Sequence, residues 1–243
     1  MQFQYQDQPL KEAPLYLLPC AKRHRVIDRR MWFELLKRVK NGASLYISSE
    51  DASFSEFEEV TGLEVVAREE RTSPFKLLLD GVEDGLSFTA EGPVKYILKN
   101  NRARVLGYEE PDNPVFTSVK YGRGTVYFLS IPLESGLIAK PGAFHTLEAP
   151  CWWKIYEHIA KEVVSGRVVS KASSFTGLTE HPLDKNNRVI YMINYSPLPV
   201  TERVRLKKGW KLKKVLYGAK TAGSTDSFNL KANDATVFTV RSS

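Results

Sequence analysis

The spacing of apolar residues near the N-terminus predicts a strand, a helix and a second strand. The run 14–18 is typical of a short buried strand. Asp28 is a suitable N-cap for the helix, and Asn41-Gly42 supplies the glycine that a left-handed C-cap needs. The apolar residues between these caps have helical spacing: Met31, Trp32, Leu35, Leu36 and Val39. Because an apolar strand follows at 43–48, the segment predicts a β-α-β unit with parallel strands.

The pattern then shifts toward short strands. A short helix that Ser53 or Ser55 could cap ends at Gly62, and several aromatic and β-branched runs follow between about 75 and 133. The sequence Tyr121-Gly122-Arg123-Gly124 between two of these runs predicts a hairpin, because glycine readily adopts the positive φ of a tight turn. A helix is expected over 151–164, with Pro150 at its start and His158 on its solvated side.

After Gly166 only strand patterns occur, at the short intervals typical of a small antiparallel sandwich. Residues 165–243 carry 14 Lys and Arg against 5 Asp and Glu, a net charge of +9, whereas the preceding residues carry 21 against 23, a net charge of −2. This change in composition supports two domains, 1–164 and 165–243.

Targeting signals are missing from the sequence as given. No apolar run approaches the roughly 18 residues that a membrane span requires. The start, MQFQYQDQPLKEA, has neither the basic nor the apolar region of a signal peptide. A cytoplasmic location is therefore favoured, unless the chain is a piece of a longer protein.

Two cysteines are candidates for thiol chemistry, each with a histidine nearby in the sequence. Cys20 precedes His24 within a basic loop, and Cys151 follows His145 at the start of the expected helix, whose dipole would favour a thiolate. A nucleophile elbow, however, needs small residues around the nucleophile, and no glycine flanks Cys20. We favour packed thiols at both positions and assign no catalytic residue.

Metal, cofactor and nucleic-acid sites are not indicated. The four histidines share no metal-ligand spacing, so we expect neither a metal nor a cofactor. The basic residues Arg203, Arg205 and Lys207 alternate along one expected strand, as do Lys211 and Lys213 along the next. Period-two charge is typical of the solvated face of a half-buried sheet, and no aromatic RNA-binding motif accompanies it.

The order of these elements resembles the non-catalytic part of family 42 β-galactosidases and related glycoside hydrolases. The segment LYLLPCAKRHRVIDRRMWFELLKRVKNGASLYISSEDASF resembles the first strand, helix and second strand of their trimerisation domain. PVFTSVKYGRGTVYFLSIPLE resembles that domain's closing hairpin, at Tyr121, Gly122, Gly124, Val126 and Tyr127. RVIYMINYSPLPVTERVRL and ATVFTV are similar to the small C-terminal β-sandwich of the same enzymes.

The resemblance implies an α/β fold: a flavodoxin-like domain, related to class I glutamine amidotransferases, followed by a β-sandwich. It implies an accessory role, with the catalytic barrel upstream in the same polypeptide or on a partner subunit, and with homo-oligomers and carbohydrate as further partners. No catalytic carboxylate can be transferred to this chain, because the barrel is absent. We expect partner or sugar contacts at five residues: Lys22, Arg23, His24, Arg25 and Trp210.

Two other functions stay open at this point. The first is an amidotransferase-like thiol hydrolase that uses Cys20 or Cys151. The second is a carbohydrate-binding module in which exposed Trp210, Tyr195 or Tyr217 stacks on sugar rings.

Overall fold

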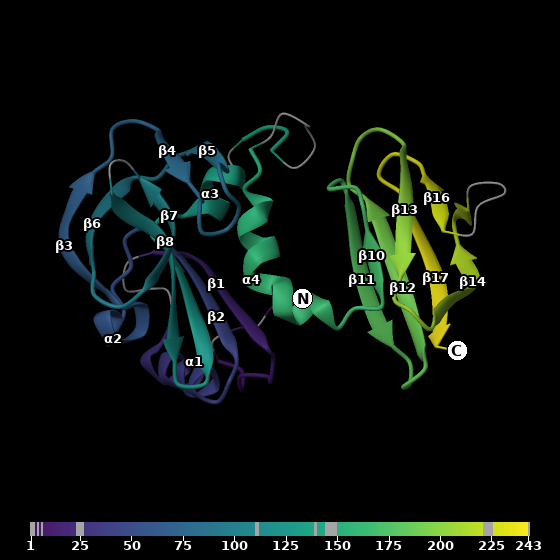
Figure 1. Cartoon of the computed structure of the whole chain (residues 1–243), viewed down its shortest axis with the longest axis horizontal. Coiled ribbons are helices and arrows are strands. Elements are labelled where there is room, and N and C mark those ends of the chain that lie inside the picture. The colour runs from purple at the N-terminus through teal and green to yellow at the C-terminus, as the bar shows by residue number, and fades with distance from the viewer. Residues whose placement is uncertain are drawn as a thin grey trace. The chain divides into compact units, whose positions relative to one another are not determined.

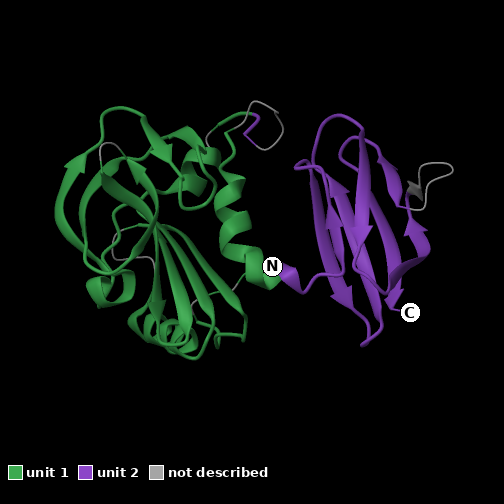
Figure 2. Ribbon diagram, in the orientation of Figure 1, with its two compact units in different colours: residues 1–141, 150–163 green, residues 142–149, 164–243 purple. Residues whose placement is uncertain are grey.

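The computed structural model describes residues 3, 5, 7–22, 27–109, 112–138, 140–143, 150–220 and 226–242. These residues form two compact units (Figure 2). Unit 1 comprises 1–141 and 150–163, and unit 2 comprises 142–149 and 164–243. Within the described ranges, no helix has both the length and the apolar character needed to cross a membrane.

Unit 1 begins with the predicted β-α-β unit. Strand β1 (Leu15–Ala21), helix α1 (Arg29–Lys40) and strand β2 (Ser44–Ser49) follow one another, and the two strands are parallel. The Asp28 carboxylate accepts the Met31 backbone N–H at 2.8 Å, which confirms the predicted N-cap. All five predicted apolar residues of α1 are buried, and four of them, all but Met31, pack into the core beside the sheet. Caps and helical spacing are local signals, so this part of the fold could be predicted from the sequence.

The main sheet of unit 1 is mixed and curled, in the order β1-β2-β9-β8-β7-β4-β5 (Figure 1). β1, β2 and β9 are parallel, and the strands from β9 to β5 pair antiparallel. The strands after β2 are β9 (Gly124–Leu129), β8 (Asn113–Tyr121), β7 (Arg104–Glu109), β4 (Phe75–Leu78) and β5 (Ser87–Ala90).

The flavodoxin-like prediction is therefore wrong for this sheet, although its β-α-β start is present. A flavodoxin-like sheet is parallel and joins its strands through crossover helices. Here the segment between Phe75 and Leu129 contains strands and no helix among its described residues, and its sequential pairs β4–β5, β7–β8 and β8–β9 are antiparallel. Without crossover helices, consecutive strands must reverse direction, and the structure is mostly β.

The predicted hairpin is confirmed at the turn between β8 and β9, where Tyr121 pairs with Gly124. Gly122 has φ 61°, a conformation that favours glycine. A Cβ atom on Gly124 would lie only 2.0 Å from the Ala43 carbonyl oxygen. The second glycine is thus required by close packing of the turn against the end of α1.

The remaining elements of unit 1 differ from the predictions in their boundaries. Helix α2 (Phe57–Thr61) ends at Gly62 as expected, but its N-cap is Glu56 rather than Ser53 or Ser55. The remaining elements are β3 (Leu63–Glu70) and β6 (Val94–Asn100), which form a separate antiparallel pair, α3 (Leu133–Ile138) and α4 (Trp153–Ser165).

Helices α1 and α4 cover opposite faces of the parallel strands. The Leu45 and Ile47 side chains pack with α1, whereas Tyr46 of β2 contacts Tyr156 of α4. His158 of α4 is half-buried against Phe116 and Tyr127, so its predicted solvated position is wrong. Burial, together with nearby cations, lowers the pKa of His158.

Unit 2 consists of two four-stranded antiparallel sheets that enclose one apolar core, as the strand pattern predicted. Phe228 and Phe238, one from each sheet, stack with ring centroids 4.8 Å apart. One sheet contains β10 (Val169–Lys171), β13 (Val200–Leu206), β16 (Ser227–Leu230) and β15 (Ala219–Lys220). The other contains β11 (Thr176–Pro182), β12 (Asn187–Asn194), β17 (Ala235–Ser242) and β14 (Trp210–Tyr217).

Candidate functional site

A cleft of about 420 Å³ lies at the carboxyl ends of the parallel strands of unit 1. Glu50, directly after β2, and Ser135, on the helix that follows β9, form one side. Arg71 and Glu91, from the connections before β4 and after β5, form another. In open α/β sheets, ligands bind outside the carboxyl ends of the strands. The cleft is therefore the candidate functional site of this unit.

A partly buried carboxylate, Glu134, accepts hydrogen bonds from four donors beside the cleft. Its Oε2 atom accepts the Ser48 hydroxyl at 2.5 Å and the Cys20 thiol at 3.4 Å. Its Oε1 atom accepts the Tyr46 hydroxyl at 3.0 Å and also the Tyr156 hydroxyl. The donors come from β1, β2 and α4, so Glu134 ties three elements to α3.

The two tyrosines of this cluster remain protonated donors. Burial, followed by the negative charge of Glu134, raises the pKa of Tyr46 and of Tyr156. Neither phenol can act as a general base near neutral pH, because both keep their protons there. Their role at Glu134 is to hold the carboxylate in place and to compensate its partial burial.

Cys20 adopts an unusual backbone conformation within the same cluster. Its φ is 52°, and the register of β1 against β2 shifts between Leu18 and Ala21. The Cys20 N–H donates to the Ser48 hydroxyl at 2.7 Å, which compensates part of the roughly 1–2 kcal/mol cost of a left-handed residue. Cys20 thus lies at an irregularity within β1, because Ala21 still pairs with Ser49 of β2.

The environment of Cys20 disfavours its thiolate. Burial is the largest cause that raises the Cys20 pKa, and the Glu134 charge adds to it. The Ser135 N–H donates to the Cys20 Sγ at 3.2 Å and opposes this effect only partly. Because the thiolate is the nucleophile in thiol chemistry, the geometry supports a hydrogen-bonded structural thiol.

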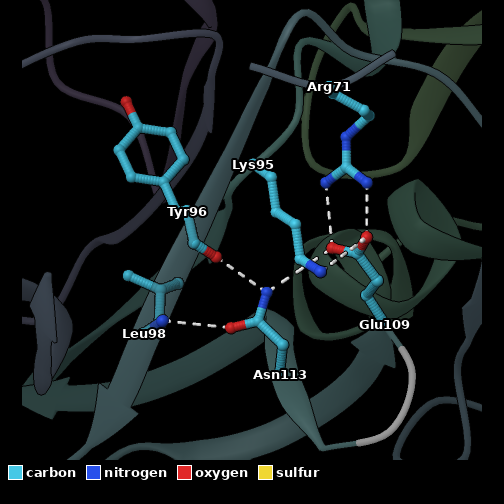
Figure 3. Close-up of polar contacts among 6 residues, drawn as sticks. All are labelled: Arg71, Lys95, Tyr96, Leu98, Glu109 and Asn113. Atoms are coloured by element: carbon cyan, nitrogen blue, oxygen red, sulfur yellow. Dashed lines mark hydrogen bonds and ion pairs between the residues drawn. The ribbon is translucent and has the colours of Figure 1, made fainter. Parts of the chain in front are cut away.

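The opposite wall of the cleft rests on a buried ion pair between Arg71 and Glu109 (Figure 3). Both side chains are only 7% exposed, and the guanidinium binds the carboxylate in a bidentate manner, with one N–O distance of 2.9 Å. Lys95 approaches the same carboxylate at 3.9 Å, and Asn113 donates to it at 3.4 Å. Asn113 also bridges to β6 through the Tyr96 carbonyl.

Arg71 is held from a second side as well. Its guanidinium lies 3.8 Å from the centre of the Phe75 ring, and its backbone N–H donates to the Pro93 carbonyl. Its Nε atom is buried without a hydrogen-bond partner among the described residues. Sequence reasoning did not single out Glu134, Arg71 or Glu109. The available signal for Glu134 was an acid just after a buried strand, in GTVYFLSIPLE.

The candidate site residues predicted from the sequence lie in different parts of the structure. Lys22 forms an ion pair with Glu50 at 2.6 Å and so lies at the edge of the cleft. Cys151 precedes α4, and its carbonyl accepts the Lys154 N–H. Trp210 is half-buried against the sandwich core, with the Arg188 guanidinium 5.1 Å from its ring centre.

Four predicted positions, Arg23, His24, Arg25 and His145, lie outside the described residues. Over the described ranges, no three His, Cys, Asp or Glu side chains gather in an arrangement that could hold a metal ion.

No known family profile matches the sequence, and no curated protein matches it. Solved structures do match. Gan42B, a GH42 β-galactosidase from G. stearothermophilus, aligns over 94% of this chain and 32% of its own, with a TM-score of 0.61 and 16% identity. The β-galactosidase from Bacillus circulans sp. alkalophilus aligns over 93% and 32%, with a TM-score of 0.63 and 13% identity. The chain shares its fold with part of these glycoside hydrolases.

A third neighbour is the α-L-fucosidase isoenzyme 2 from Paenibacillus thiaminolyticus. It aligns over 95% of this chain and 41% of its own, with a TM-score of 0.63 and 10% identity. The chain therefore spans about a third of the length of the β-galactosidases and somewhat more of the fucosidase. In each case the alignment includes nearly all of both units, so the succession of the two folds is shared.

Proposed function

We propose that this chain is a non-catalytic accessory region of a glycoside hydrolase whose catalytic barrel lies elsewhere, in the same polypeptide or on a partner subunit. The observation that carries the proposal is the extent of the structural match. Nearly the whole chain aligns with glycoside hydrolases, yet it accounts for only about a third of the β-galactosidases. A match that includes two units in the same order is more specific than a match to one common fold.

In this proposal, residues 1–164 form an assembly domain of the trimerisation type, and residues 165–243 form the sandwich domain that follows. The chemistry of the cleft favours support over catalysis. Glu134 is occupied by four donors, and Glu109 is neutralised by Arg71. Both carboxylates are therefore bonded to neighbouring side chains of the cleft, which leaves neither of them free to contact a substrate.

The rim of the cleft is the surface we assign to the catalytic partner. The Lys22 side chain is 58% exposed and pairs with Glu50 at this edge. The rim of the cleft therefore carries charged side chains. Charged rims set the orientation and rate of docking more than its affinity. The cleft would then help to shape the border of an active site that another domain provides.

The first test is to sequence the complete transcript that encodes this chain and to purify the natural protein with its partners. We expect a barrel in the same reading frame or a co-purifying barrel subunit, and hydrolysis of a nitrophenyl galactoside, fucoside or mannoside by the complex alone. The isolated chain should hydrolyse none of them and should sediment as a homo-oligomer.

A pair of charge reversals locates the contact. Lys22→Glu should lower the glycosidase activity that co-purifies, whereas Lys99→Glu, an equal charge change at an exposed residue of β6, should not. A transcript without a barrel, together with a strictly monomeric chain that recovers no glycosidase, would overturn the proposal. Equal effects of the two reversals would refute the rim contact.

A further inference from the structure

One outer face of the sandwich carries three exposed tyrosines, Tyr191, Tyr195 and Tyr217. In the sheet β11-β12-β17-β14, Ile190, Met192 and Phe238 point into the core and are buried. The alternate positions point outward. We name as the aromatic face the outward residues Thr179, Tyr191, Tyr195, Tyr217, Val237 and Thr239.

Two tyrosines of this face lie in one row across three neighbouring strands. Tyr191 of β12 pairs with Val237 of β17, which in turn pairs with Tyr217 of β14. Two strand spacings place the tyrosine backbones about 10 Å apart, a distance comparable with the length of a disaccharide. Tyr191 and Tyr217 are 42% and 58% exposed, so both rings are accessible.

Local contacts hold all three tyrosines in position. The His181 ring meets the Tyr191 ring edge-on at 5.1 Å, and the Tyr217 hydroxyl donates to Asp234 at 3.2 Å. Tyr195, 51% exposed, lies against Gly177 of β11, where a Cβ atom would come within 2.5 Å of its ring. Rings that are fixed before binding lose little conformational entropy when a ligand arrives.

Charge is absent from the part of this face formed by β11, β12 and the first five residues of β17, although residues 165–243 are strongly basic. The outward positions within 177–181, 189–193 and 235–239 contain no Lys, Arg, Asp or Glu. Exposed basic residues border this patch on β14, where Lys214 pairs with Thr239 and Lys211 pairs with Arg241 of β17. An uncharged patch that is rich in aromatic rings marks an interaction site, and it matches a ligand that is uncharged where it contacts those rings.

We propose that the aromatic face binds a neutral saccharide chain. The C–H faces of pyranose rings are apolar and would stack on Tyr191 and Tyr217. The hydroxyl groups of the same rings would meet the hydroxyls of Thr179, which pairs with Tyr191, and of Thr239, which pairs with Val189 and Lys214. This assignment replaces Trp210, which faces the core, and it does not depend on the accessory role proposed above.

The test is native affinity electrophoresis of the full chain in gels containing soluble galactan, galactomannan or hydroxyethyl cellulose, with polygalacturonate as a charged comparison. We expect retardation in at least one neutral gel. The double variant Tyr191→Ala/Tyr217→Ala should bind at least about tenfold more weakly, because two stacking contacts are lost. Tyr5→Ala, which removes a 75% exposed tyrosine from unit 1, should bind as the unchanged chain does.

A second variant distinguishes loss of binding from loss of the fold. Thr179→Lys places a charge at an exposed position of the face without removing a tyrosine, and it should also weaken retardation while leaving the far-UV circular dichroism unchanged. Retardation by polygalacturonate alone would overturn the proposal in favour of charge attraction. Absence of retardation in every neutral gel, or oligomers that dissociate in the double variant without any saccharide binding, would overturn it in favour of a protein interface.

Discussion

The ion pair between Arg71 and Glu109 should be the most sensitive charged contact in unit 1. Glu109→Gln keeps the size of the side chain but removes the charge opposite a guanidinium that is 7% exposed. Because Arg71 would then be a buried cation with a neutral partner, we expect unfolding to become easier by about 3–5 kcal/mol. Lys95, 3.9 Å from the same carboxylate, would lose its counter-charge as well.

The variant that replaces both residues should differ in stability from the variant that replaces Glu109 alone. Replacing the pair with apolar side chains, in Arg71→Met/Glu109→Leu, removes both charges and leaves no buried ion without a partner. Buried ion pairs replaced in this way are often as stable as the original or more so, by about 1–4 kcal/mol. The double variant should therefore be clearly more stable than Glu109→Gln.

Urea unfolding followed by tryptophan fluorescence can measure the effect in unit 1. Three of the four tryptophans, Trp32, Trp152 and Trp153, belong to that unit, and a Trp210→Phe background removes the signal of unit 2. With a slope of about 2 kcal/mol per molar urea, the expected loss lowers the midpoint by about 1.5–2.5 M.

An exposed ion pair in the same unit supplies the control. Glu64 and Lys99 lie 2.8 Å apart with side chains 45% and 63% exposed, so Glu64→Gln should leave the midpoint unchanged. If Glu109→Gln shifts the midpoint by less than about 0.3 M, or no more than the control, then solvent reaches the Arg71 pair and the reasoning from burial is refuted.

Three further predictions concern single residues. Asp28→Ala should cost unit 1 about 1 kcal/mol in urea unfolding through loss of the N-cap; an unchanged midpoint would contradict it. Gly124→Ala should cost about 1–3 kcal/mol or more by the same assay, whereas Gly136→Ala, with open space around its Cβ position, should not. Because its pKa is raised, Cys20 in a Cys151→Ser chain should react with iodoacetamide at pH 7 more slowly than free cysteine and accelerate as the pH rises; faster labelling would refute the assigned environment.

Local signals in the sequence determined much of the secondary structure. The Asp28 cap, the apolar spacing of α1 and the glycines of the β8–β9 turn each act over a few residues, so each could be predicted without knowing the fold. The alternating strands of unit 2 likewise determined an antiparallel sandwich, with Arg203 and Arg205 of β13 exposed as expected.

Long-range packing decided the remaining features. The direction of the strands from β4 to β9 depends on which neighbours they meet across the sheet, and a short apolar run is compatible with parallel or antiparallel pairing. Glu134 meets Cys20 across 114 positions of sequence, and Arg71 meets Glu109 across 38. No local pattern reports such contacts, because burial and pairing of a charged side chain exist only once distant segments have come together.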